Sequence, residues 1–187
     1  MLARNRLWGA GLLLALCSTG SAQYAISQYP GPTTPFGIAA GPDGNLWFTD
    51  YGVFSNPPIN PSSIGCITPA GVVVEYTASA TAGSNPSGIA AGPDGNLWYT
   101  EMGNPKWSTG NRIGSITTAG VVTEYSTGLS AASEPNQIAA GPDGNLWFTE
   151  TAGNRIGSIT TTGVITEYPV PTPKSSPFGI AAPGATS

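Results

Sequence analysis

One long phrase recurs in this chain and constrains its fold more than any other feature. The phrase Ile-Ala-Ala-Gly-Pro-Asp-Gly-Asn-Leu-Trp-(Phe/Tyr)-Thr-(Asp/Glu) spans residues 38–50, 89–101 and 138–150, and a fourth copy starts at Ile180 and stops after Ile-Ala-Ala. Tandem repeats with a period of about 40–50 residues are typical of folds in which each unit buries its apolar surface against the next. The chain is therefore expected to be a series of stacked units.

The third copy is the most compact and predicts four short strands in one unit. Small residues at 137–141 are followed by the turn sequence Pro-Asp-Gly-Asn at 142–145, which favours a tight reversal of the chain. Residues 146–149, 155–160 and 164–168 are rich in strand-forming side chains. Four antiparallel strands in each unit of this length indicate an all-β fold, the blade of a β-propeller.

The repeat predicts about three complete blades in a domain that spans residues 23–187. Known propellers close with about 4–8 blades, so three blades would leave apolar faces uncovered at both ends. The chain is expected either to associate with other copies through these open ends or to be a truncated relative of a longer protein. The expected blades cover residues 36–76, 87–125 and 136–168, with flanking strands at 24–29 and 178–182.

The repeat also assigns roles to side chains that recur in every copy. The second strand carries a tryptophan in each blade, which is expected to pack between neighbouring blades: Trp47, Trp98 and Trp147. The outermost strand carries an acidic residue in each blade, which is expected to be solvated and to discourage edge pairing: Glu75, Glu124 and Glu167.

The first 22 residues have the pattern of a secretory signal peptide. Arg4 and Arg6 precede an apolar run that ends at Leu16, and the small residues Gly-Ser-Ala at 20–22 form a cleavage site. Cleavage is expected after Ala22, which predicts a secreted or periplasmic protein. The apolar run is shorter than a membrane-spanning helix requires.

The charge and the missing residue types exclude several functions. Cleavage would leave four basic residues against ten acidic ones, a net charge of −6, so nucleic acid and anionic membranes are not expected partners. The chain contains no histidine, which is the usual general base near neutral pH and the commonest ligand of transition metals. Cys66 would be the one cysteine left, and without a histidine to activate it we do not expect a nucleophile there.

Three motifs together resemble the virginiamycin B lyases, also called streptogramin B lyases. They are Gly-Pro-Asp-Gly-Asn-Leu-Trp-Phe-Thr-Glu at 141–150, Gly-Asn-Arg-Ile-Gly-Ser-Ile-Thr at 153–160, and Gly-Val-Ile-Thr-Glu-Tyr at 163–168. The resemblance implies a family of seven-bladed propellers, in which this chain would form an incomplete ring. It also implies a magnesium-dependent elimination that opens cyclic depsipeptide antibiotics.

The same resemblance points to candidate site residues in the third blade. In the family, two glutamates hold magnesium, and a histidine in the sequence Glu-Pro-His-Gly-Ile acts as the base. Here Glu134 and Glu150 match the two glutamates, so they are the predicted Mg²⁺ ligands. Asn136 stands at the position of the histidine. Its amide cannot take up a proton at useful pH, but it can accept a hydrogen bond or bind an ion, so Asn136 is a candidate for ligand binding.

Other residues are candidates for ligand binding at the same end of the blades. Asp50 and Glu101 end the second strand of their blades as Glu150 does, and Trp107 lies in an enlarged loop. The alternative is that these acids are structural, with Glu101 paired to Arg112 and Glu150 to Arg155 in weak salt bridges. For Trp107, the alternative is that the ring covers the backbone of its own loop.

The sequence supports a leading function and leaves two others open. The leading hypothesis is a non-catalytic module that binds a small molecule, a peptide or a partner and self-associates into a homo-oligomer. One alternative is a magnesium-dependent C–O lyase that linearises streptogramin B antibiotics with a base from elsewhere. The other is a decayed fragment without an independent function.

Overall fold

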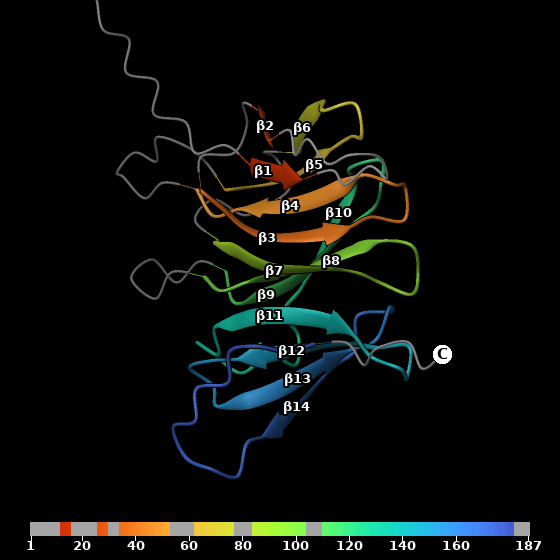
Figure 1. Cartoon of the computed structure of the whole chain (residues 1–187). Coiled ribbons are helices and arrows are strands. Elements are labelled where there is room, and N and C mark those ends of the chain that lie inside the picture. The colour runs from red at the N-terminus through yellow and green to blue at the C-terminus, as the bar shows by residue number, and fades with distance from the viewer. Residues whose placement is uncertain are drawn as a thin grey trace, which may run out of the picture.

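The computed structural model describes residues 12–15, 26–29, 34–52, 62–76, 84–103 and 110–181. These residues form an all-β structure with three four-stranded antiparallel sheets and one two-stranded sheet. The three larger sheets lie one after another in a stack (Figure 1). Each corresponds to one copy of the repeat, so the predicted propeller blades are confirmed.

Each blade is a meander in which consecutive strands pair. Blade 1 contains β3 (Pro35–Ala40), β4 (Leu46–Asp50), β5 (Ser63–Ile67) and β6 (Val73–Tyr76). Blade 2 contains β7 (Pro86–Ala91), β8 (Leu97–Glu101), β9 (Arg112–Ile116) and β10 (Val122–Tyr125). Blade 3 contains β11 (Pro135–Ala140), β12 (Leu146–Glu150), β13 (Arg155–Ile159) and β14 (Ile165–Pro169).

The repeated turn between the first two strands is fixed by hydrogen bonds that its sequence makes possible. In blade 3, Asp143 accepts hydrogen bonds from the backbone and side chain of Asn145 and from the indole of Trp147. Gly144 has a positive φ of 79°, a conformation that glycine adopts at little cost. The turn therefore also orients the tryptophan that follows it.

Neighbouring blades are joined by an apolar interface, which we call a seam. Trp47 and Trp98 are fully buried, one in each seam, as their repeated position predicts. Seam 1, between blades 1 and 2, contains Trp47, Ile64, Cys66, Ile89, Leu97, Tyr99 and Ile116. Seam 2, between blades 2 and 3, contains Trp98, Ile113, Ile138, Leu146, Phe148 and Ile159.

The first and last blades each present one face that no described blade covers. Ile38 of blade 1 is 49 % exposed, whereas its counterparts Ile89 and Ile138 are buried in the seams. On blade 3, Tyr168 is 46 % exposed and Trp147 is only half-buried. The predicted packing of Trp147 between two blades is therefore not realised among the described residues, and the expected open faces are observed.

Of the two predicted flanking strands, the first is observed and the second is not. In the first, β2 (Ile26–Tyr29) pairs antiparallel with β1 (Leu12–Ala15), which lies inside the predicted signal peptide. In the second, residues 178–181 form no strand. In each complete blade the equivalent segment pairs with the strand that carries the Leu-Trp-(Phe/Tyr)-Thr motif.

No helix among the described residues is long and apolar enough to cross a membrane.

Candidate functional site

The second strand of each blade ends in an acidic side chain that is buried. Asp50 is 4 % exposed, and Glu101 and Glu150 are fully buried. Each lies opposite the proline that opens the first strand of its blade. Although the three positions are equivalent, their surroundings differ from blade to blade.

Asp50 is fixed in place by hydrogen bonds from neighbouring segments. Its Oδ1 atom accepts hydrogen bonds from the backbone N–H of Thr34 at 3.1 Å, the Thr34 hydroxyl at 2.6 Å and the backbone N–H of Gly52 at 3.0 Å. These bonds hold the loop before β3 against the end of β4, which is a structural role.

Glu101 is buried beside an arginine and a second glutamate. The Glu101 carboxylate lies 3.9 Å from the guanidinium of Arg112, which is also 3.6 Å from Glu124. Burial first, and then the charge of Glu124, raise the pKa of Glu101 to about 8. Because burial disfavours the charged carboxylate, the protonated and uncharged form is favoured at neutral pH.

Glu150 has similar surroundings, but its predicted pairing with Arg155 is replaced by another. Arg155 lies 3.5 Å from Glu167 instead. Burial and the charge of Glu167 raise the pKa of Glu150 to about 7, with Arg155 opposing them. A side chain at Gly153 would approach the Glu150 carboxylate within 2.8 Å, so this glycine leaves room for the acid.

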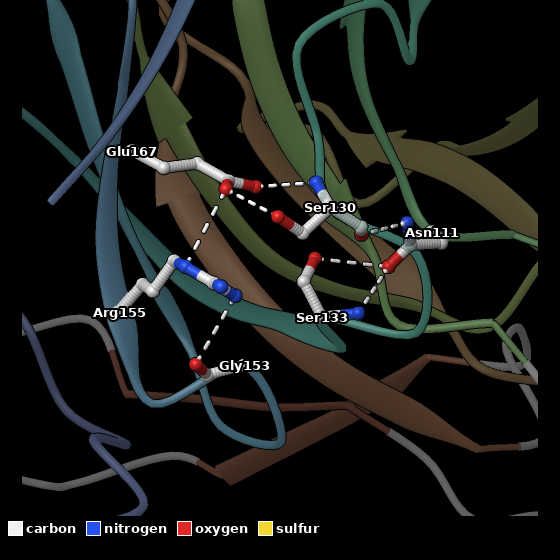
Figure 2. Close-up of polar contacts among 6 residues, drawn as sticks. All are labelled: Asn111, Ser130, Ser133, Gly153, Arg155 and Glu167. Atoms are coloured by element: carbon white, nitrogen blue, oxygen red, sulfur yellow. Dashed lines mark hydrogen bonds and ion pairs between the residues drawn. The ribbon is translucent and has the colours of Figure 1, made fainter. Parts of the chain in front are cut away.

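A polar network that joins Glu167 and Arg155 to the link between blades 2 and 3 was not predicted from the sequence (Figure 2). Glu167 accepts hydrogen bonds from the backbone N–H and the hydroxyl of Ser130, which lies in the link between blades 2 and 3. The amide of Asn111 donates to the carbonyl of Ser130, and its Oδ1 atom accepts from the N–H and hydroxyl of Ser133. The network ties the link to the edge of both blades.

The interpretation of the outer-strand acids as solvated is confirmed for Glu75, which is exposed, and is wrong for Glu124 and Glu167. The Glu167 side chain is only 14 % exposed, and both Glu124 and Glu167 are paired with an arginine. The repeated Gly-Asn-Arg motif was the available signal, because Asn154 fixes the link after blade 3 as Asn111 fixes the link before it.

Glu134 lies in the link immediately before β11 and has an unusual backbone. It is half-buried, and its φ of 53° lies in the left-handed region that few side chains other than glycine and asparagine adopt readily. Its N–H donates to the Oδ1 atom of Asn111, and its carbonyl accepts from the N–H of Thr151. These two bonds hold the strained residue in place.

The surroundings of Glu150 offer few of the features that a magnesium ion prefers. Mg²⁺ prefers several oxygen ligands with space for bound water, whereas this carboxyl is fully buried, favours its protonated form below about pH 7 and has an arginine nearby. The groups that set its pKa are Glu167 and Arg155, and Glu134 is not among them. The described ranges contain no group of three or more His, Cys, Asp or Glu side chains that could hold a metal. The metal role of Glu134 and Glu150 thus stays a prediction.

Asn136, at the position that the resemblance assigns to the base, is part of the interior. It is 2 % exposed, and its carbonyl accepts a hydrogen bond from the hydroxyl of Thr100 in the preceding blade. Its side chain lies 3.4 Å from the hydroxyl of Ser87 and 3.5 Å from the sulfur of Met102. Trp107, the remaining ligand-binding candidate, lies outside the described residues.

These features define a partial β-propeller, and comparison with known proteins places it in a family. The model of the virginiamycin B lyase family matches residues 54–186. The chain belongs to the virginiamycin B lyase family. None of the curated proteins matches it.

Solved structures agree with this assignment. A catalytically inactive histidine-to-alanine variant of virginiamycin B lyase from Staphylococcus aureus, solved with quinupristin, is 34 % identical, with a TM-score of 0.73 over 87 % of this chain and 51 % of that one. A streptogramin B lyase structure is 38 % identical, with a TM-score of 0.70 over 85 % of this chain and 49 % of the other. The chain thus spans about half the length of these relatives.

Proposed function

We propose that this chain is an interaction module built from virginiamycin B lyase blades, which self-associates and does not catalyse the lyase reaction. The observation that carries this proposal is the contrast in burial of equivalent side chains. Ile89 and Ile138 are buried in the seams, and their counterpart Ile38 is half exposed on blade 1. Faces that are built for blade-to-blade contact but lie open favour a partner of the same kind.

The absence of catalysis is supported by the state of the candidate site. Asn136 is packed against Ser87 and Met102 at the position of the expected base, and Glu150 is buried beside an arginine. Both side chains are buried and are not open to a substrate. Among the solved relatives, a variant that lacks one histidine is described as catalytically inactive.

Two measurements test the proposal together. Sedimentation of the purified protein should give a mass above that of one chain, and a streptogramin B antibiotic should persist in its presence with or without Mg²⁺. A folded protein that stays monomeric at high concentration would remove the interaction role. Turnover of the antibiotic would contradict the proposal that the protein does not catalyse the lyase reaction.

The lyase reaction is the second candidate, and Glu134 is the observation that favours it. A strained backbone at a half-exposed glutamate is typical of residues retained for function. If the protein opens the cyclic depsipeptide, Glu134→Gln should abolish that activity. Glu75→Gln, on the outer strand of blade 1, should leave the activity unchanged.

We also propose that the protein is exported, on the basis of residues 1–22. Cleavage after Ala22 would remove β1 and leave β2 without its pairing strand. Mass spectrometry of the protein recovered from outside the cytoplasm should find Gln23 at the new N-terminus.

A further inference from the structure

The outward face of blade 3 is one half of a seam whose other half is present on blade 1. In seam 1, the ring of Tyr76 lies against Gly120, where an added side-chain carbon would come within 2.2 Å of it. In seam 2, Tyr125 lies in the same way against Gly163. Tyr168 is their counterpart on blade 3, and it stacks on Trp147 with ring centroids 5.5 Å apart, as each earlier tyrosine stacks on its own tryptophan.

The segment after blade 3 indicates which sequence fits this face. In both seams the threonine of the second strand donates a hydrogen bond to the next blade, as Thr49 does to the carbonyl of Ser87 at 2.7 Å. Thr149 donates in the same way to the carbonyl of Phe178 at 2.9 Å. Residues 177–182 read Pro-Phe-Gly-Ile-Ala-Ala, which is identical to β3 at residues 35–40 and differs from the equivalent segments of blades 2 and 3.

The segment covers this face only in part. Residues 177–181 form no strand, Phe178 is 56 % exposed, and Tyr168 remains 46 % exposed. Blade 1 carries the same hexapeptide as the first strand of a complete sheet, with Ile38 half exposed on its outward face. A complete blade in this position would bury the rings that the lone segment leaves in contact with water.

We propose that blade 1 of a second copy packs on the outward face of blade 3, with its strand Pro35–Ala40 taking the place of residues 177–181. This inference rests on the proposed self-association and names its partner and its contact. Because the two contacting faces are different, the contact is head-to-tail, and two copies related by a half-turn would form two identical seams and close a ring. Such a ring would contain six blades, twice the three of one copy, within the roughly 4–8 blades of known propellers.

Complementary variants test this head-to-tail contact. Trp147→Arg should abolish the dimer because it damages the blade 3 face, and Ile38→Asp should abolish it because it damages the blade 1 face. A mixture of the two variants should restore a dimer, because one intact seam can still form between them. Val121→Asp, at an exposed apolar residue of blade 2, is the matched control and should leave the native mass unchanged. Circular dichroism and thermal melting confirm that each variant is folded.

A separate pair of variants tests whether Pro35–Ala40 of the second copy replaces residues 177–181. Phe178→Asp should leave dimer affinity unchanged or raise it, because residues 177–181 leave the blade 3 face when the dimer forms. Ile38→Asp should weaken dimer affinity at least tenfold. Loss of the dimer on Phe178→Asp, or a dimer that survives both Trp147→Arg and Ile38→Asp, would overturn the proposed contact while leaving self-association intact. A wild-type protein that is monomeric would overturn both the proposed contact and the proposed self-association. It would favour coverage of the blade 3 face by further blades of a longer chain.

Discussion

The two seams and the two outward faces are built from the same repeated side chains, yet they differ in what those side chains do. Trp98 is fully buried between two blades, and its counterpart Trp147 is half-buried on the face of the last blade. The sequence around the two tryptophans is nearly identical. The difference shows that an interblade residue is fully buried only where the next blade is present.

The contrast between the seams and the outward faces predicts that the free energy of unfolding changes most at the tryptophans. Trp98→Ala should lower the free energy of unfolding by about 3–5 kcal/mol, because it opens a cavity in a closely packed seam. Trp147→Ala should cost about 1–2 kcal/mol, because part of its ring already contacts water. Urea denaturation at a concentration where the protein is monomeric measures both. Equal losses would show that the two surroundings are the same.

A smaller effect is expected from the acid buried in blade 2. The pKa of Glu101 is raised from its ordinary 4.5 to about 8, so the folded chain binds this proton more tightly than the unfolded chain. Its contribution to stability is therefore greatest below about pH 4.5 and is lost as the pH rises to about 8. Each pH unit across this range changes the free energy of unfolding by at most about 1.4 kcal/mol, so the loss should be about 2–4 kcal/mol.

Glu101→Gln removes the titrating group and should flatten this pH dependence in urea or thermal unfolding. Glu150→Gln is the matched variant, and its effect should be smaller and end near pH 7, because the pKa of Glu150 is raised only to about 7. A wild-type stability that rises between pH 5 and 8 would contradict the sign of this prediction.

A smaller loss of stability is expected when the hydrogen bond across a seam is removed. The hydroxyl of Thr100 donates to the carbonyl of Asn136 and accepts from the N–H of Gly88, all within the interior. Thr100→Val should cost about 1–3 kcal/mol, because it leaves buried polar groups unpaired. Thr149→Val should cost about half as much, because water can reach the exposed Phe178 segment. The reverse order, measured by thermal unfolding, would exclude this account.

The smallest effect is expected at the strained link before blade 3. Glu134→Asn should raise the free energy of unfolding by about 0.5–1 kcal/mol, because asparagine adopts a left-handed backbone more readily than glutamate. Asn85 occupies the equivalent position before blade 2, with a φ of 54°, and shows that the fold accepts asparagine there. Asn85→Glu should destabilise the protein by more than this amount, because Asn85 is buried and its amide donates hydrogen bonds to the Tyr51 hydroxyl and the Gly103 carbonyl.

The blades could be predicted from the sequence because their determinants are local. The Pro-Asp-Gly-Asn turn and the strand after it lie within a few residues of each other, and their repetition sets the spacing of the units. The flanking segment at 178–182 could not be predicted in this way. Whether it forms a strand depends on a pairing partner, and the repeated motif by itself does not supply one.

The candidate site was less predictable because its chemistry depends on contacts between distant residues. Position in the repeat identified Glu150 as an acid at the end of a strand. It did not reveal that Arg155 would pair with Glu167, or that Ser130 would donate to that same glutamate from the link between blades. The charges of Glu167 and Arg155 act on the pKa of Glu150, and both contacts join residues of different strands or links.

The mass of the unmodified protein in solution tests the central claim most directly. Sedimentation equilibrium over a wide range of concentrations should show a species of two copies, which dissociates only on dilution. A folded protein with the mass of one copy at every concentration would contradict the claim that its outward faces are the two halves of one seam.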